Sequence, residues 1–434
     1  MKSATKHEAQ MRRATLLCVS VAFPVVLSAQ GAGPSRTTLL NHVTVIDVNG
    51  SPPMRDMAVV ITGNRITAVD LAGRVRVPPN AETIDASGKF VVPGLADMHH
   101  HLDTGFSMPG LPGAGRAGPQ DFKRHLAQML AWGFTTIFSP AHTYPDLKDF
   151  TSLRSAASDD TAPLARYFGV GRAITVKGGH ASQPPFVWPE VMQAIIAEAH
   201  ALGLRAYVHA PNLRQAKEVL RAGADGLVHS VVDAPVDDEF IGLMKKNRAS
   251  YTTTLSVFAA FADVAAWMQR LEALDERGVI PKKVFDAYTS PDGARNYYAA
   301  FGTMTKEQPE YLRSNVRKVV DAGILVLSGT DTSVPGVLIG VSSQMELILL
   351  VEAGLTPTEA LRAATINAAK MLGRENDRGT VEAGKLADLS CSMPIRSRIS
   401  GTSARFLASS KAVSSTIQRN CSPPTAEAAR PLTS

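Results

Sequence analysis

Short apolar runs alternate along this chain with longer amphipathic stretches, a pattern typical of strands and helices in turn. Apolar residues recur at helical spacing in residues 189–204, 212–224 and 306–322. Seven apolar runs that read as strands follow one another: residues 90–98, 135–139, 166–176, 205–209, 226–229, 250–257 and 324–328. Strands that alternate with helices in this way predict an α/β fold with parallel strands, here a (β/α)8-type TIM barrel.

The rest of the body predicts a smaller domain. We expect residues 30–86 and 375–389, the two ends of the body, to form a β-sandwich. The barrel would then occupy residues 87–374. A chain of 434 residues is long enough for one large barrel and a satellite domain of this kind.

Polar residues stand at the ends of four of the predicted strands. They are His99, His101, His209, His229 and Asp331. The C-terminal ends of barrel strands meet on one face, where active sites lie. A lone histidine at a strand end is more often an ordinary core or loop residue, but four imidazoles and a carboxylate gathered on one face predict a hydrolytic metal site.

The first two of these histidines form a pair with a defined geometry. Side chains alternate across a strand, so His99 and His101 point to the same side while His100 points away. The pair can therefore bind one ion together. Asp97 is placed to orient an imidazole by accepting a hydrogen bond from it.

On these residues the chain resembles the amidohydrolase superfamily, which carries HxH after strand 1, single histidines after strands 5 and 6, and aspartate after strand 8. The flanks are similar as well: TIDASGKFVVPGLADMHHHL precedes the site, and LTPTEALRAATINAAKMLG and GTVEAGKLADL follow it. Residues 177–180, Lys-Gly-Gly-His, resemble the GGH motif of the prolidase and imidazolonepropionase-like branch. The similarity runs from about residue 39 to residue 389.

The resemblance implies a role for each residue. His99 and His101 would bind a first divalent metal ion, Zn²⁺ or a similar one, and His209 and His229 a second. Asp331 would be a further ligand, hold the attacking water, take its proton and pass it to the leaving nitrogen. With a single ion, His229 would instead hydrogen-bond the developing oxyanion. Whether one or two ions bind stays open.

The chain departs from the family between the GGH motif and His209. The family has a fourth strand there, often ending in an N-carboxylated lysine that bridges two metals, whereas this sequence passes directly into a helix. Lys177 is the only lysine of the region and the one candidate for that bridge, a pocket-lining lysine being the simpler interpretation. Either the site binds one ion, or an internal segment was lost. We expect a gap or a rearrangement beside the strand that ends in His209.

Four further residues are weaker candidates for substrate contacts: His142, Arg172, His180 and Tyr251. Arg172 and Tyr251 are placed to hold a substrate carboxylate, although ordinary structural roles explain both equally simply. His180 and His142 follow predicted strands and would line the pocket or hold a loop. His125 and His200 lie on predicted outer helices and have no predicted role.

Residues 1–29 predict a secretory signal peptide. Four basic residues precede the apolar run ATLLCVSVAFPVVL, and small residues follow it. An uncleaved anchor is the alternative. We expect a periplasmic or secreted protein with no stable membrane insertion after cleavage. The net charge of +6 includes +3 from this segment and +5 from residues 390–434, which leaves −2 for the body and predicts no nucleic-acid partner.

Residues 390–434 do not continue the family pattern and contain 11 serines without strand alternation. A DNA sequence that encodes this segment in one reading frame can encode VVLDANPLADIRNVRAI and then PRVVKGGQLYDP in the frame one base away. The second of these peptides looks like a strand, a glycine turn and a strand. Our hypothesis is that this tail is translated out of frame and disordered, which would leave an unpaired edge on the small domain. An ordinary disordered serine- and arginine-rich tail is the alternative.

The sequence therefore predicts a metal-dependent amidohydrolase that hydrolyses an amide or cyclic amide bond of a small molecule, such as a dipeptide or an N-acyl amino acid. The competing hypothesis is a catalytically impaired metal-binding remnant, because motif residues show ancestry and not activity. The substrate, the metal and the oligomeric state, a homo-oligomer included, stay open.

Overall fold

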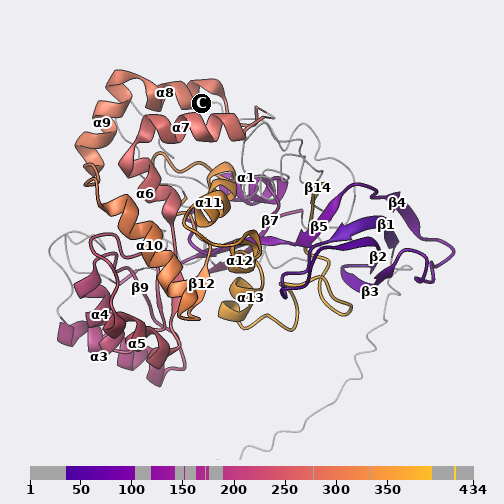
Figure 1. The fold of residues 1–434 in the computed structure, drawn as a ribbon, viewed down its shortest axis with the longest axis horizontal. Helices are drawn as coiled ribbons and strands as arrows, with labels where there is room; N and C mark the ends of the chain where they lie inside the picture. The colour runs from indigo at the N-terminus through magenta and orange to yellow at the C-terminus, as the bar shows by residue number, and fades with distance from the viewer. Residues whose placement is uncertain are drawn as a thin grey trace, which may run out of the picture. The chain divides into compact units, whose positions relative to one another are not determined.

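The computed structural model describes residues 36–102, 119–141, 151, 163–171, 173–174, 189–276, 278–332, 334–392 and 415–416. Within them the chain forms two sheets of parallel strands, one mixed sheet and a set of helices (Figure 1). None of the helices in these ranges is both long enough and apolar enough to span a bilayer.

Each of the seven predicted strands of the α/β repeat contributes one strand to two parallel sheets. The first sheet has the order β6 (Leu95–Asp97), β7 (Phe134–Ser139), β8 (Arg166–Gly169). The second has the order β12 (Leu325–Leu327), β11 (Ser250–Thr252), β10 (Gly226–Leu227), β9 (Tyr207–Val208). Every neighbouring pair in these two sheets runs parallel, as expected for strands joined by helical crossovers.

The two parallel sheets meet at one of their edges. A parallel bridge joins His100 to Thr332, and the Met98 N–H donates to the Ser328 carbonyl at 2.8 Å. At the opposite edges, no ladder joins β8 to β9 among the described residues. The fold is mixed α/β with a barrel-like arrangement of strands, but a closed barrel is not confirmed. The predicted lack of a fourth strand falls between β8 and β9, where residues 172 and 175–188 lie outside the described residues.

The predicted first strand, residues 90–98, is two strands in different sheets. β5 (Phe90–Pro93) belongs to the mixed sheet, whereas β6 pairs with β7. Gly94 lies between them. A Cβ atom at Gly94 would stand 2.1 Å from Thr135 Oγ1, so only glycine permits this close crossing from one sheet to the other.

Helices cover the parallel strands and carry most of the apolar core. They are α1 (Pro119–Ala131), α3 (Pro189–Ala201), α4 (Leu213–Arg221), α5 (Asp238–Asn247), α6 (Leu255–Ala262), α7 (Val264–Leu274), α8 (Lys282–Thr289), α9 (Pro291–Phe301), α10 (Gln308–Asp321), α11 (Val341–Glu352), α12 (Pro357–Ala363) and α13 (Ile366–Leu372). Figure 1 shows α7, α8 and α9 stacked together, an insertion between β11 and β12. The predicted strand 250–257 ends at Thr252 because the run LSVFAAFA forms the buried helix α6 instead.

The mixed sheet is built from both ends of the body, as predicted, but it is one sheet. Its strands are β1 (Thr37–Val45), β2 (Met54–Thr62), β3 (Arg65–Leu71), β4 (Glu82–Asp85), β5, β13 (Leu389–Ser392) and β14 (Ser415–Thr416). Arg65 at the start of β3 also bridges Leu386, and a cluster of buried apolar residues contains side chains both of the strands β1, β2 and β3 and of residues 381–391. The predicted β-sandwich of two facing sheets is not shown.

The C-terminal strand β13 runs three residues past Leu389, into the segment that we expect to be out of frame. It pairs antiparallel with β5, and Cys391 is buried in the core of the mixed sheet. The Ser390 hydroxyl donates to the Gly133 carbonyl at 2.7 Å. Apart from β14, residues 393–434 lie outside the described residues.

Candidate metal centre

Four strands of the two parallel sheets lead into the predicted ligands. His99 and His101 follow β6, His209 follows β9, His229 follows β10, and Asp331 follows β12. Because parallel strands in such a repeat end on the same face, these side chains converge although they lie far apart in the sequence. His100, between the first two, is fully buried, and its Nδ1 lies 3.5 Å from the Asp97 carboxylate.

Three ligand atoms converge closely at the end of β6. His99 Nε2 and His101 Nε2 lie 3.2 Å apart, and Asp331 Oδ1 lies 3.2 Å from the former and 3.1 Å from the latter. Ligands bonded at about 2.0 Å in a tetrahedral zinc site are separated from one another by roughly 3.3 Å. The nitrogen and oxygen donors therefore have the chemistry and the spacing that a divalent cation requires.

His229 and His209 extend this cluster. The His229 ring lies 4.5 Å from the ring of His99 and 4.3 Å from the ring of His209, measured between centroids. One ligand atom from each of His99, His229 and Asp331 lies within 4.8 Å of the others. The structure thus brings the predicted histidines and the aspartate together in one place.

The buried surroundings set the charge of two of these groups. Burial, with the neighbouring histidines His209 and His99, lowers the pKa of His229 well below its usual value, which keeps a lone pair available at neutral pH. Burial alone would raise the pKa of Asp331, but His99 and His101 reverse this and hold it well below its usual range. A neutral imidazole beside an ionised carboxylate is the combination that binds a cation.

Backbone and hydroxyl groups orient the imidazoles from behind. His101 Nδ1 lies 3.1 Å from the Ala141 carbonyl, and His229 Nδ1 lies 2.8 Å from Thr254 Oγ1. Each contact engages Nδ1 and leaves Nε2 for the cluster. Thr254 is not recognisable in the sequence, because a threonine in a turn carries no signal of such a role.

Asp97 supports the site differently from the prediction. Its carboxylate accepts hydrogen bonds from the backbone N–H of His99 at 3.2 Å and of Thr330 at 3.1 Å, and from the hydroxyls of Thr330 and Ser343, each at 2.7 Å. The imidazole closest to it is that of His100, at 3.5 Å. Asp97 therefore fixes the chain segments that carry the ligands rather than a ligand ring.

The weaker candidates are not part of this cluster within the described residues. Tyr251 is fully buried on β11, where its hydroxyl accepts a hydrogen bond from the Val231 N–H at 2.8 Å, and burial raises its pKa to about 12. His142, Arg172, Lys177 and His180 lie outside the described residues. Among the histidines without a predicted role, His200 pairs with Asp225 at the surface, and His125 is buried on α1.

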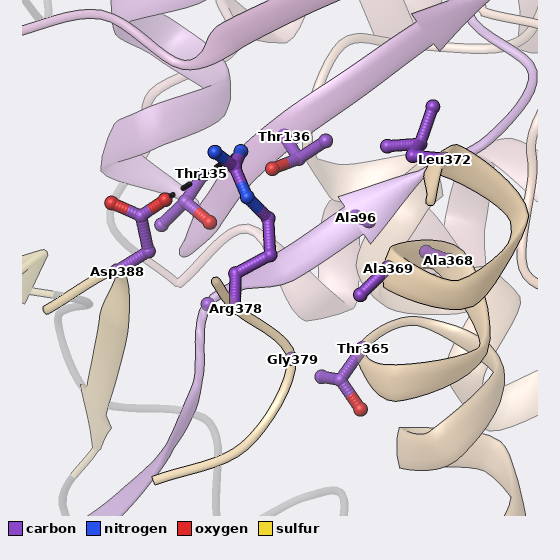
Figure 2. Close-up of a pocket in the computed structure, with 11 residues that line it drawn as sticks. Ala96, Thr135, Thr136, Thr365, Ala368, Ala369, Leu372, Arg378, Gly379 and Asp388 are labelled. Atoms are coloured by element: carbon purple, nitrogen blue, oxygen red, sulfur yellow. Dashed lines mark ion pairs between the residues drawn. The ribbon is translucent and has the colours of Figure 1, made fainter. Parts of the chain in front are cut away.

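A small pocket lies at the other end of the strands. Figure 2 shows its walls: Ala96, Thr135 and Thr136 from β6 and β7, residues of α13, and Arg378 directed between Asp388 and the threonines. Gly94 precedes β6 and His99 follows it, so the pocket and the histidine cluster occupy opposite ends of the same strand. The pocket is therefore separate from the candidate metal centre.

Comparisons with known proteins identify the family of this chain. The chain is similar to the imidazolonepropionase of Geobacillus sp. (strain WCH70), with 27% identity over 416 residues that cover 84% of this chain and 88% of the relative. Among solved structures, a putative prolidase from Bifidobacterium longum superposes with a TM-score of 0.61 at 22% identity, covering 83% of this chain and 89% of that one. An Xaa-Pro dipeptidase with bound methionine superposes with a TM-score of 0.62 at 22% identity, covering 82% and 93%. Residues 90–416 match the amidohydrolase family, and the chain belongs to that family.

Proposed function

We propose that this protein is a metal-dependent hydrolase of the C–N bond in an amide or cyclic amide, such as a dipeptide or an N-acyl amino acid. The observation that carries the proposal is the convergence of His99 Nε2, His101 Nε2 and Asp331 Oδ1 within 3.2 Å of one another. The family supports a hydrolase of C–N bonds, and the relatives named above act on bonds of this kind.

The residues divide the work in the following way. His99, His101, His229 and Asp331 would hold a divalent cation, with Zn²⁺ as the first candidate, and His209 borders them. When bound, such a cation lowers the pKa of water and polarises the scissile carbonyl. Asp331 accepts a hydrogen bond from the attacking water, takes its proton and delivers it to the leaving nitrogen.

We infer one ion rather than two. His99, His229 and Asp331 present their ligand atoms as a single group, which favours a shared cation. The bridging lysine of two-metal relatives has no counterpart in the described residues, and Lys177 stays a prediction outside them. We further infer that the parallel strands form the barrel of the family.

The proposal is tested on the purified full-length protein by metal analysis and by a substrate panel of Xaa-Pro dipeptides, N-acyl amino acids and cyclic amides. One zinc per chain, with turnover that is lost in Asp331→Asn and retained in Asp275→Asn, supports it. Asp275 is a matched control because it is a buried carboxylate that accepts from the backbone of Val279 and Ile280. A folded protein without zinc or turnover overturns it.

The second candidate function is a metal-binding remnant without catalysis. Among the described residues no ladder joins β8 to β9, and this favours it, because an altered barrel can keep its ligands and lose its substrate site. Soluble protein that binds zinc through the cluster and turns over no member of the panel supports this alternative.

We also propose a periplasmic or secreted location. It rests on the order of basic, apolar and small residues in the first 29 positions. N-terminal sequencing of the protein from a periplasmic fraction tests it, and an intact Met1 there would contradict it.

A further inference from the structure

The turn between β11 and α6 has an unusual backbone conformation. Thr254 adopts φ 49° and ψ 41°, the left-handed region, which a β-branched residue rarely enters. A residue held there is strained, and the surroundings must offset that strain. Thr254 is fully buried, so its hydroxyl finds its partner within the protein.

Thr254 stands at the N-cap of α6 without capping it. A threonine at this position ordinarily accepts a hydrogen bond from the first turn of its helix, but Thr254 makes no such bond. Its hydroxyl lies instead 2.8 Å from Nδ1 of His229. The Thr254 side chain therefore contacts a residue of the candidate metal centre and does not cap its own helix.

Glu346, from α11, takes over the capping. Its carboxylate accepts from the N–H of Leu255 at 2.9 Å and from the N–H of Ser256 at 2.7 Å. It also accepts from the hydroxyls of Thr253 at 2.6 Å and of Ser256 at 2.7 Å. Glu346 is fully buried, so these four donors replace water as its partners.

These contacts link Glu346 to His229 through two steps. The residues bound by Glu346, Thr253 and Leu255, are the immediate neighbours of Thr254 on both sides. With both neighbours anchored, the turn cannot relax into the ordinary N-cap geometry. The Thr254 hydroxyl therefore remains directed at the imidazole.

We propose that Glu346 is a positioning residue for the candidate metal ligand His229, acting through Thr254. The inference rests on the proposed function, in which His229 binds a cation. With Nδ1 protonated, His229 donates to Thr254 Oγ1, and its Nε2 lone pair stays free to serve as the ligand in the group that His229 forms with His99 and Asp331. Loss of a partner of this kind typically weakens metal affinity about 10- to 100-fold.

The alternative is that Glu346 only caps α6 and has no effect on His229, and the experiment must distinguish these two roles. The experiment measures zinc affinity by competition with a chromophoric chelator in the full-length protein. The variants are Thr254→Val, which removes the hydroxyl at constant shape, Thr254→Ser, which retains it, Glu346→Gln, and the double variant Thr254→Val/Glu346→Gln. Asp275→Asn is the matched loss of a buried carboxylate outside the network.

The proposal predicts about 10-fold weaker zinc binding in Thr254→Val and in Glu346→Gln, with near wild-type affinity in Thr254→Ser and Asp275→Asn. The double variant should bind zinc no more weakly than Thr254→Val, because both changes remove the same contact. Additive losses, or an unchanged affinity in Glu346→Gln, would overturn it.

A second readout needs no metal. In the zinc-free protein, ¹⁵N chemical shifts of His229 should report one tautomer, with the proton on Nδ1, in the wild type and in Thr254→Ser. Glu346→Gln should shift the ring toward a mixture of tautomers, as Thr254→Val does, and an unchanged tautomer in Glu346→Gln counts against the proposal.

The two proposals fail in distinguishable ways. If His101→Ala and Asp331→Asn both bind zinc as the wild type does, the proposed metal centre is wrong, and so is the role of Glu346. Zinc binding that is abolished by those two changes and unaffected by Thr254→Val and Glu346→Gln would leave the metal centre standing and defeat only the role of Glu346.

Discussion

Asp97 ties together the two chain segments that carry the closest ligands. Its two oxygens accept four hydrogen bonds, from the backbone of His99 and Thr330 and from the hydroxyls of Thr330 and Ser343. Asp331, which follows Thr330, in turn donates its N–H to the His99 carbonyl at 2.7 Å. The position of Asp331 relative to His99 is therefore fixed from behind by a buried carboxylate.

Asp97→Asn should lower the free energy of unfolding by about 3 kcal/mol, because an amide nitrogen would face donors that now share a buried charge. Urea denaturation of the zinc-free protein measures this. Asp263→Asn is the control: Asp263 caps α7 by accepting from the Ala266 N–H, asparagine caps as well, and its effect should stay below about 0.5 kcal/mol. Equal effects of the two substitutions would contradict the role given to Asp97.

The ionisation of Glu346 should appear in the pH dependence of stability. Burial raises its pKa from 4.5 to about 7, although hydrogen bonds from Thr253 and Ser256 oppose the shift. Because the folded-state pKa lies above the unfolded value, Glu346 contributes stability below about pH 4.5 that is lost as the pH rises through about 7.

Between pH 4.5 and pH 8, the wild type should lose about 3 kcal/mol of unfolding free energy relative to Glu346→Gln, which has no carboxyl group to titrate at this position. Urea titrations of the zinc-free proteins at a series of pH values measure it, and every other titrating group cancels in the difference. A flat difference across this range would show that Glu346 titrates as an exposed carboxyl does.

At the scale of elements, the strand ends could be predicted from the sequence and the turns behind them could not. The period of two in a strand places His99 and His101 on one side, and parallel strands bring His229 and Asp331 to the same face. Thr254 and Glu346 have no such period, because their contact depends on how α11 packs against the start of α6. The residues that converge at the strand ends could therefore be predicted from the sequence, whereas the residues that hold them in place could not.

Periodicity likewise predicted strands but not their limits or their sheets. The continuous apolar run 90–98 hides a change of sheet at Gly94, since hydrophobicity does not report which neighbour a strand pairs with. The apolar run after Thr252 forms a buried helix, which a short window cannot distinguish from a buried strand.

The loop after β12 passes so close to Thr252 on β11 and to His99 after β6 that it requires a glycine at position 329. A Cβ at Gly329 would lie 2.6 Å from Thr252 Cγ2 and 2.8 Å from His99 Cβ. Gly329→Ala should cost about 1–3 kcal/mol of stability and weaken zinc binding, because the backbone beside His99 must move. Thermal unfolding and the chelator competition measure the two effects.

Gly242 supplies the control for that substitution. It lies in α5, and a Cβ atom added there would have nothing within 4 Å, so Gly242→Ala should raise stability by roughly 0.5–1 kcal/mol and leave zinc affinity unchanged. A Gly329→Ala protein that behaves like Gly242→Ala would show that the loop has room to spare.

For the whole molecule, a buried ion pair joins the parallel strands to the C-terminal segment. Arg166 on β8 binds Asp388 with Nε at 2.8 Å and Nη2 at 3.3 Å. Arg378 lies 3.9 Å from the same carboxylate, as Figure 2 shows for this second pair. Asp388 directly precedes β13, so this pair holds the mixed sheet against the barrel-like part.

Asp388→Leu should lower the free energy of unfolding by about 3–5 kcal/mol, because it leaves two buried guanidinium groups without their shared carboxylate. The double variant Arg166→Met/Asp388→Leu should recover part of that loss by removing one of the charges. Chemical denaturation measures both, and a double variant less stable than Asp388→Leu would mean that the packing of Arg166 outweighs its charge.

The C-terminal tail allows a direct test of the out-of-frame hypothesis. β13 already pairs with β5, and Ser390 and Cys391 are both buried, so apolar residues at these two positions would be buried as well. Replacing residues 390–418 by VVLDANPLADIRNVRAIPRVVKGGQLYDP supplies valines and a leucine there and a second strand pair beyond. Burial of the added valines and the leucine should stabilise the protein, and in a large chain each kcal/mol gained raises the melting temperature by a few degrees. The melting temperature should therefore rise by at least about 2 °C.

A scrambled version of the same replacement segment is the matched control, since it keeps the composition and removes the alternation of apolar and polar residues. An unchanged melting temperature, or an equal rise in the scrambled protein, would show that the present tail is not a shifted reading of a family strand.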